Sequence, residues 1–165
     1  ISVTSEVGKG STFVVELPFE MGAAPEKSKK EEADKENSIH GLNLMLVEDN
    51  ELNREIATAI MKEIGLEVDT AEDGTDAVNI MSSAEGRKYD LIFMDIQMPI
   101  LNGYDTTAKI RQMENPKKAT TPIVAMTANA FEEDRKKAFD AGMNAHIAKP
   151  IDIEKLRAAI LRMEF

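Results

Sequence analysis

Five side chains suited to phosphoryl chemistry stand directly after four short apolar runs of this chain. The runs are 44–47, 91–94, 123–126 and 145–148, and the residues that follow them are Glu48, Asp49, Asp95, Thr127 and Lys149. If the runs are parallel strands of one sheet, these residues emerge together at its carboxyl edge, where ligands bind in such sheets. Three carboxylates, a hydroxyl and an ammonium can bind a divalent cation and a phosphoryl group.

The three carboxylates predict a metal site. Without a counter-ion, Glu48, Asp49 and Asp95 would raise one another's pKa at a cost in stability, so the cluster calls for a cation. Oxygen ligands with no His or Cys among them favour Mg²⁺ or Mn²⁺ over zinc. Beside such an ion, Thr127 and Lys149 can hold two oxygens of a phosphoryl group, whereas each alone has an ordinary structural explanation at a strand end.

Strand and helix patterns alternate along most of the chain. After residue 41, each of five short apolar segments is followed by a segment with helical spacing of its apolar residues. Strands that are apolar throughout are typical of a parallel sheet covered on both faces. We therefore predict the α/β class, with a doubly wound, five-stranded parallel sheet of flavodoxin-like type and helices on both faces. The expected strands are 42–47, 66–70, 91–94, 123–126 and 145–148.

Particular residues mark the ends of the expected helices. An apolar stripe from Leu52 to Ile64 predicts the inner face of the first helix, and Gly65 predicts its end. Asp73 and Asp152 are expected to cap the second and the last helix. We also expect a cis peptide at Lys149–Pro150, because X-Pro bonds have the only cis isomer of low energy and a tight turn follows the fifth strand.

Composition limits the function classes. The chain has 165 residues, a formal net charge of −10 and no cysteine. It can form one core of ordinary size, its charge disfavours binding to nucleic acid, and it has no thiolate metal site. No apolar stretch is long enough to span a bilayer. Because the sequence begins at Ile1, we expect it to be a piece of a longer protein. The absence of cysteine and of a membrane span leads us to expect a cytoplasmic piece without membrane contact of its own, whose parent could be an inner-membrane sensor.

The first forty residues differ from the rest. Residues 1–21 contain alternating β-formers around a glycine-rich turn at 7–11, which is typical of a hairpin. Residues 22–40 are crowded with mixed charge, so they predict a flexible linker. The expected main domain is 41–165.

Four ordered motifs stand at the strand ends: Val47 to Asn50, Met94 to Pro99 with Gly103, Met126 to Ala130, and Ala148 to Pro150. These motifs resemble those of response-regulator receiver domains, especially receivers fused to hybrid histidine kinases. The resemblance implies the strand order 2-1-3-4-5 and acceptance of a phosphoryl group from phosphohistidine in a two-component phosphorelay. The hairpin of 1–21 is similar to the last hairpin of the kinase ATP-binding domain, so the parent is expected to be a protein-histidine kinase.

The resemblance implies a role for each acidic residue. Asp95 is the expected phosphoacceptor, which would attack the phosphorus in line to give an aspartyl phosphate. Asp49 and Asp95 would ligate Mg²⁺ directly. The main-chain carbonyl of Gln97 would be the third protein ligand, and Glu48 would act mainly through metal-bound water.

The resemblance also implies how the phosphoryl group is bound and sensed. Thr127 and the Ala128 amide would bind its oxygens, and Lys149 would pair with its charge. His146 stands where the family usually has a switching Tyr or Phe. We expect a switch formed by Thr127 and His146, although a strand residue at position 146 can equally be a packing residue.

Two amides bear on lifetime and on the alternatives. Gln97 and Asn129 occupy the family positions that tune hydrolysis of the aspartyl phosphate, and as neutral amides they predict an intermediate lifetime of that phosphate. A Mg²⁺-dependent phosphatase of haloacid dehalogenase type would need an aspartate in place of Gln97, because an amide cannot transfer protons. A flavodoxin-like cofactor binder would place its phosphate against the acidic residues. A receiver that signals by contacts alone, without phosphorylation, is the remaining alternative.

The expected partners carry histidine. They are the histidine-containing dimerisation domain of the same or a partner kinase and, further along a relay, a histidine phosphotransfer protein. The helix expected at 129–141 could support a weak homodimer or be an ordinary solvated helix.

Overall fold

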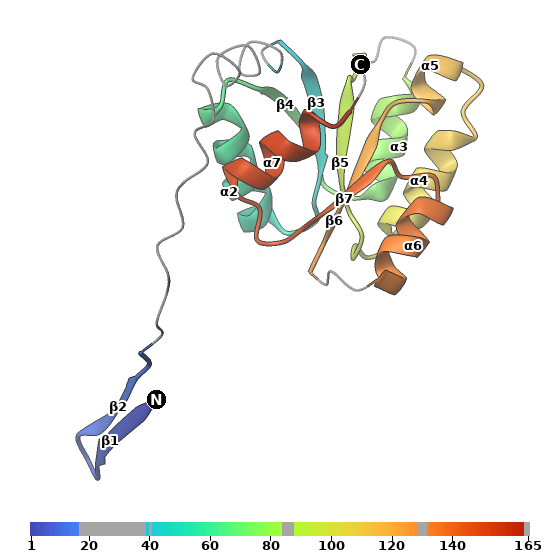
Figure 1. The fold of residues 1–165 in the computed structure, drawn as a ribbon. Coiled ribbons are helices and arrows are strands. Elements are labelled where there is room, and N and C mark those ends of the chain that lie inside the picture. The colour runs from blue at the N-terminus through green and yellow to red at the C-terminus, as the bar shows by residue number, and fades with distance from the viewer. Residues whose placement is uncertain (17–38, 40, 84–87, 129–131, 164–165) are drawn as a thin grey trace.

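The structure is a computed structural model that describes residues 1–16, 39, 41–83, 88–128 and 132–163 (Figure 1). Five strands form one parallel sheet with the order β4-β3-β5-β6-β7. The predicted sheet and its strand order are therefore confirmed. The strands are β3 (Asn43–Val47), β4 (Glu67–Ala71), β5 (Leu91–Asp95), β6 (Ile123–Thr127) and β7 (Ala145–Ala148).

Helices cover both faces of this sheet. Helices α2 and α7 lie on one face, and α3, α4 and α6 lie on the other (Figure 1). A short helix, α5, precedes β6 and was not predicted from the sequence. The helices are α2 (Glu51–Glu63), α3 (Gly74–Ser82), α4 (Gly103–Arg111), α5 (Pro116–Ala119), α6 (Glu132–Asp140) and α7 (Ile153–Ile160).

Alternate strand residues build two separate cores. Successive side chains of a strand point to opposite faces, so Leu46 packs under α2 and α7 while Val47 packs under α3 and α4. Every residue of β5 and β6 is buried, as expected for central strands covered on both sides. Ile39, just before the sheet, is also buried in the first core.

The predicted helix ends are confirmed. The side chains of Asp73 and Asp152 accept hydrogen bonds from backbone amides in the first turns of α3 and α7, at 2.8 Å in both cases. Gly65 follows α2 with φ at +80°, a left-handed conformation that glycine adopts without a steric penalty.

The predicted inner face of α2 is wrong at its amino-terminal end. Leu52 and Ile56 are 64% and 52% exposed, whereas the buried positions are Ala57, Met61 and Ile64. A helix on one face of a sheet turns one stripe into the core, and in α2 that stripe runs through Ala57 and Met61 to Ile64. Leu52 and Ile56 lie outside that stripe and therefore remain on the surface.

Residues 2–14 form the predicted hairpin. Strand β1 (Ser2–Glu6) pairs antiparallel with β2 (Gly10–Val14), from Ser2 opposite Val14 to Glu6 opposite Gly10. The linker predicted at 22–40 lies outside the described residues except for Ile39. Within the described segments, no helix combines the length and the apolar character needed to cross a bilayer.

Candidate metal and phosphoryl site

The carboxyl ends of four strands bring the predicted site residues together. Glu48 and Asp49 follow β3, Asp95 is the last residue of β5, and Thr127 is the last residue of β6. Lys149 follows β7, and its backbone amide donates to the Thr127 carbonyl at 2.8 Å. The edge of the sheet thus assembles side chains that are far apart in sequence, as the alternation of strands and helices requires.

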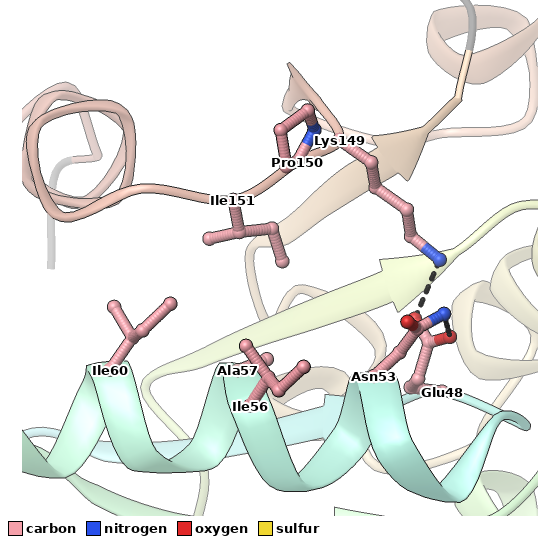
Figure 2. Close-up of a pocket in the computed structure, with 8 residues that line it drawn as sticks. All are labelled: Glu48, Asn53, Ile56, Ala57, Ile60, Lys149, Pro150 and Ile151. Carbon is pink, nitrogen blue, oxygen red and sulfur yellow. Dashed lines mark hydrogen bonds and ion pairs between the residues drawn. The ribbon is translucent and has the colours of Figure 1, made fainter. Parts of the chain in front are cut away.

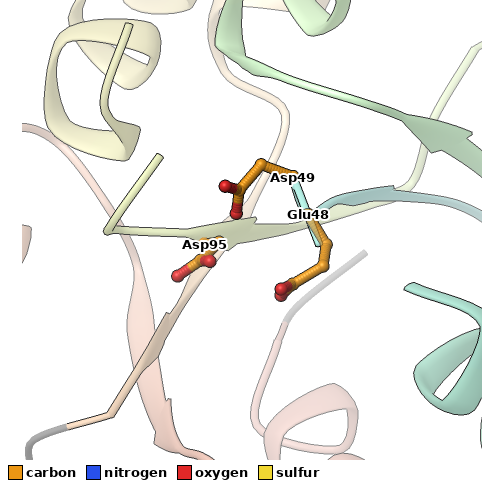
Figure 3. A group of neighbouring side chains, drawn as sticks. All are labelled: Glu48, Asp49 and Asp95. Carbon is orange, nitrogen blue, oxygen red and sulfur yellow. The ribbon is translucent and has the colours of Figure 1, made fainter. Parts of the chain in front are cut away.

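Glu48, Asp49 and Asp95 form a compact acidic cluster (Figure 3). One carboxylate oxygen from each lies within 4.8 Å of the others. Glu48 and Asp95 are buried, at 2% and 4% exposure, whereas Asp49 is exposed and opens the cluster to solvent. Two desolvated carboxylates and a third within 4.8 Å of them repel one another when ionised, so a nearby cation stabilises the cluster.

The ammonium of Lys149 provides part of this positive charge. Its Nζ atom lies 2.6 Å from Glu48 Oε2 and 2.8 Å from Asp95 Oδ2. Burial alone would lower the pKa of Lys149, but its hydrogen bonds to Asp95 and Glu48 outweigh burial and hold the pKa above its usual value. Lys149 is therefore a cation here, and one cation among three carboxylates leaves an excess of negative charge.

Asp95 is held in a partly desolvated position. Its Oδ1 atom accepts a hydrogen bond from the backbone N–H of Gln97 at 3.2 Å, and its Oδ2 atom accepts one from the Lys149 ammonium. Burial raises the pKa of Asp95, and the hydrogen bond and charge of Lys149 offset only part of that effect. A further cation at the cluster would favour the ionised carboxylate. The donor set, all oxygen, fits Mg²⁺.

The backbone around Asp95 leaves no room for a side chain at position 103. A Cβ atom added to Gly103 would lie 2.2 Å from the Asp95 carbonyl oxygen and 3.0 Å from its carbonyl carbon. Gly103 begins α4, and its amide donates to the Ile96 carbonyl at 3.1 Å. The missing side chain thus lets α4 start directly against the strand end that carries Asp95.

Two residues of α2 that sequence reasoning missed hold the acidic turn. The Asn53 amide donates to Glu48 Oε1 at 2.9 Å, and Arg54 Nη1 donates to the Glu48 carbonyl at 2.8 Å. In the sequence, only their position next to the acidic pair pointed to these two residues. The first turn of a helix that starts directly after such a pair necessarily lies beside the pair. Exposed polar residues of a helix face are too common for that signal to select these two.

The remaining predicted residues lie at or near the same edge. Thr127 is buried at 7% exposure, and Ala128 beside it is exposed. Gln97 is exposed, and its backbone N–H donates to Asp95 Oδ1. Asn129 lies outside the described residues. His146 lies within β7, paired in register with Ala125, so its proposed switch role remains a prediction.

A groove runs from the site along α2 (Figure 2). Its volume is about 160 Å³, and its far end is apolar. Glu48, Asn53 and Lys149 form the end nearest the cluster, and the peptide between Lys149 and Pro150 is cis, as predicted. The apolar lining comes from Ile56, Ala57, Ile60, Pro150 and Ile151.

Comparison with known proteins gives a consistent family. Residues 44–161 match the response regulator receiver domain. The chain is 36% identical over 165 residues to the autoinducer 2 sensor kinase/phosphatase LuxQ of Vibrio vulnificus, a match that covers 99% of this chain and 19% of that protein. The chain spans only 8% to 20% of the length of such curated relatives.

Solved structures agree with this match. The receiver domain of sensor histidine kinase PA1611 from Pseudomonas aeruginosa, crystallised with a magnesium ion in its active-site cleft, has 37% identity and a TM-score of 0.64 over 74% of this chain and 96% of that one. The receiver domain of yeast Ssk1, in complex with the histidine phosphotransfer protein Ypd1, has 31% identity and a TM-score of 0.65 over 74% and 88%. The chain therefore belongs to the response regulator receiver domain family.

Proposed function

We propose that residues 41–165 accept a phosphoryl group from phosphohistidine onto Asp95 and then pass it on or release it to water. The observation that carries the proposal is the state of Asp95. The residue is 4% exposed, and its carboxylate lies among two other carboxylates and is held by a backbone amide and an ammonium. A nucleophile fixed in this way needs little reorganisation when it reacts.

The proposed reaction is a single in-line displacement. One oxygen of Asp95 attacks the phosphorus, a P–O bond forms, and the P–N bond to the donor imidazole breaks with its electron pair moving to the nitrogen. Asp49, Asp95 and the Gln97 carbonyl would hold Mg²⁺ directly and Glu48 would do so through water. When bound, the ion supplies positive charge to the phosphoryl oxygens.

The chain's own residues would stabilise the product. Lys149 contacts the carboxylate oxygen Oδ2 of Asp95, so its ammonium can follow the new phosphoryl group without a large movement. The Thr127 hydroxyl and the Ala128 amide would bind the other oxygens. Fixed donors at the point where negative charge develops are a major source of stabilisation in such transfers.

The groove along α2 is the proposed docking surface for the phosphodonor. It has an apolar lining that includes the exposed Ile56, and one end is formed by Lys149 (Figure 2). The Lys149 ammonium in turn lies 2.8 Å from Asp95 Oδ2. An amphipathic helix that carries a histidine could lay its apolar side in such a groove and present the imidazole to Asp95. The proposed donors are a histidine-containing dimerisation domain and a histidine phosphotransfer protein, the latter supported by the Ypd1 complex of the related receiver.

The remaining residues point to a hybrid kinase as parent. We propose that 1–21 is the last hairpin of a kinase ATP-binding domain and 22–40 a linker to the receiver, on the cytoplasmic side of the membrane. The match to LuxQ supports this assignment, because it covers 99% of the chain and so includes the hairpin.

The decisive experiment is phosphorylation by a small donor. The full chain is incubated with acetyl phosphate and Mg²⁺, and its intact mass is measured. We expect a gain of one phosphoryl group that hydroxylamine removes, that is lost in Asp95→Asn and that persists in Asp140→Asn, a matched change at an exposed end of α6. If the unaltered chain gained no phosphoryl group, the proposed function would be refuted.

A further inference from the structure

Both oxygens of the buried Glu48 carboxylate are engaged by side chains. Oε1 accepts from Asn53 Nδ2 at 2.9 Å, and Oε2 accepts from Lys149 Nζ at 2.6 Å. The Glu48 side chain is 3% exposed, so water has little access to replace these two hydrogen bonds. Its direction is therefore set by one neutral donor and one cation.

The two donors differ in what they do during the proposed reaction. Lys149 is shared with Asp95, at 2.8 Å, and would turn toward the phosphoryl group once it arrives. Within the described residues, the Asn53 side chain donates to Glu48 alone. Its backbone amide is fixed to the Asn50 side chain at 3.0 Å, at the start of α2, so its side chain starts from a defined position.

Arg54 secures the backbone of the same turn and leaves the carboxylate to Asn53. Its guanidinium donates to the Glu48 carbonyl at 2.8 Å and lies 3.4 Å from the Asp49 carbonyl. The main chain of the acidic turn is thus tied to α2 through Arg54. When Lys149 turns toward the phosphoryl group, the hydrogen bond from Asn53 would still hold the Glu48 side chain.

We propose that Asn53 is a positioning residue that keeps Glu48 directed at the metal site and thereby sets the affinity for Mg²⁺. This inference rests on the proposed function. An amide suits the task because it donates a hydrogen bond without adding charge to a crowded acidic site. Asn53 also lines the groove, so it stands between the docking surface and the buried carboxylate (Figure 2).

The test is Mg²⁺ binding to the full chain, measured by isothermal titration calorimetry. Asn53→Ala removes the donor and raises helix propensity, so α2 is expected to remain folded. The expected loss of affinity is about tenfold, the lower end of the range for groups that orient metal ligands. Asn79→Ala is the matched control, because Asn79 is an exposed asparagine within α3, and it should bind Mg²⁺ like the unaltered chain.

A conservative variant and a kinetic readout separate positioning from general stabilisation. Asn53→Gln keeps the amide and should recover part of the affinity. In Asn53→Ala, phosphorylation by acetyl phosphate should need more Mg²⁺ for half-maximal rate while the rate at saturating Mg²⁺ stays within about threefold, as expected when binding rather than chemistry is affected.

Three results would overturn the inference. They are an affinity of Asn53→Ala within twofold of the unaltered chain, an equal loss in Asn79→Ala, and no recovery in Asn53→Gln. Failure of the unaltered chain to gain a phosphoryl group on Asp95 would instead refute the proposed function, so the two failures are distinguishable.

Discussion

Replacing Gly103 by alanine should destabilise the domain, although alanine is the better helix former. Gly103 is the first residue of α4 after the cap Asn102, and its φ lies outside the left-handed region. Helix propensity alone predicts a gain of up to about 1 kcal/mol for Gly→Ala. The new Cβ atom, however, would lie 2.2 Å from the Asp95 carbonyl oxygen. The two effects have opposite signs, so their magnitudes decide the outcome.

The steric effect is the larger one. The contact has to lengthen from 2.2 Å to at least 3.0 Å, and the atoms that must move belong to the backbone of a central strand. That strand end is held by the Ile96 amide, which donates to the Met126 carbonyl at 3.1 Å. Overpacking against a backbone that cannot yield costs about 3 kcal/mol, at the upper end of the usual range. The net expected loss is about 2 kcal/mol.

Urea unfolding of Gly103→Ala, followed by circular dichroism, measures this loss. For a domain of this size, about 2 kcal/mol lowers the midpoint by about 1 M. Gly41→Ala is the control, because Gly41 has φ at +85° but open space around its Cβ position, so only the dihedral cost of about 1 kcal/mol should appear. Phosphorylation of Asp95 should also be slower in Gly103→Ala. A variant as stable as the unaltered chain would refute the reasoning.

Three further substitutions test charge, pH dependence and capping. Lys149→Met leaves the carboxylates of Glu48 and Asp95 without their ammonium. Because Lys149 is partly exposed, the free energy of unfolding should fall by an amount near the lower end of about 3–5 kcal/mol, measured by thermal or chemical unfolding. Mg²⁺ should then stabilise the variant more than it stabilises the unaltered chain. Burial, together with the charges of two arginines, lowers the pKa of His146 below 6.5. As the pH falls, the imidazole of His146 is therefore protonated in the unfolded chain before it is protonated in the folded chain. The free energy of unfolding should decrease below pH 6.5 in the unaltered chain, and it should decrease less in His146→Gln. Equal pH profiles of the two proteins would contradict this. Asp73→Ala removes the cap of α3 and should cost about 1 kcal/mol in urea unfolding, whereas no change would mean that this cap is dispensable.

Local sequence signals were sufficient for most of the fold. Short, wholly apolar strands between amphipathic segments led to the parallel sheet, and Asp73, Asp152 and Gly65 marked helix ends, because these effects act within a few residues. The stripe of α2 was misassigned for the opposite reason. Helical spacing shows that Leu52 and Ile56 share a face, but only the packing of α2 on the sheet decides that this face stays exposed.

The candidate site divides in the same way. The chemical inventory of the site follows from the sequence, because the residue types at the strand ends and the parallel topology together require Glu48, Asp49, Asp95 and Lys149 to share one edge. Which oxygen each donor holds, and that Asn53 is one of the donors, became visible in the tertiary structure. The bonds of Lys149 to Glu48 and Asp95 depend on distances of about 3 Å between strands whose relative placement is set by the whole core, so no local pattern in the sequence encodes them.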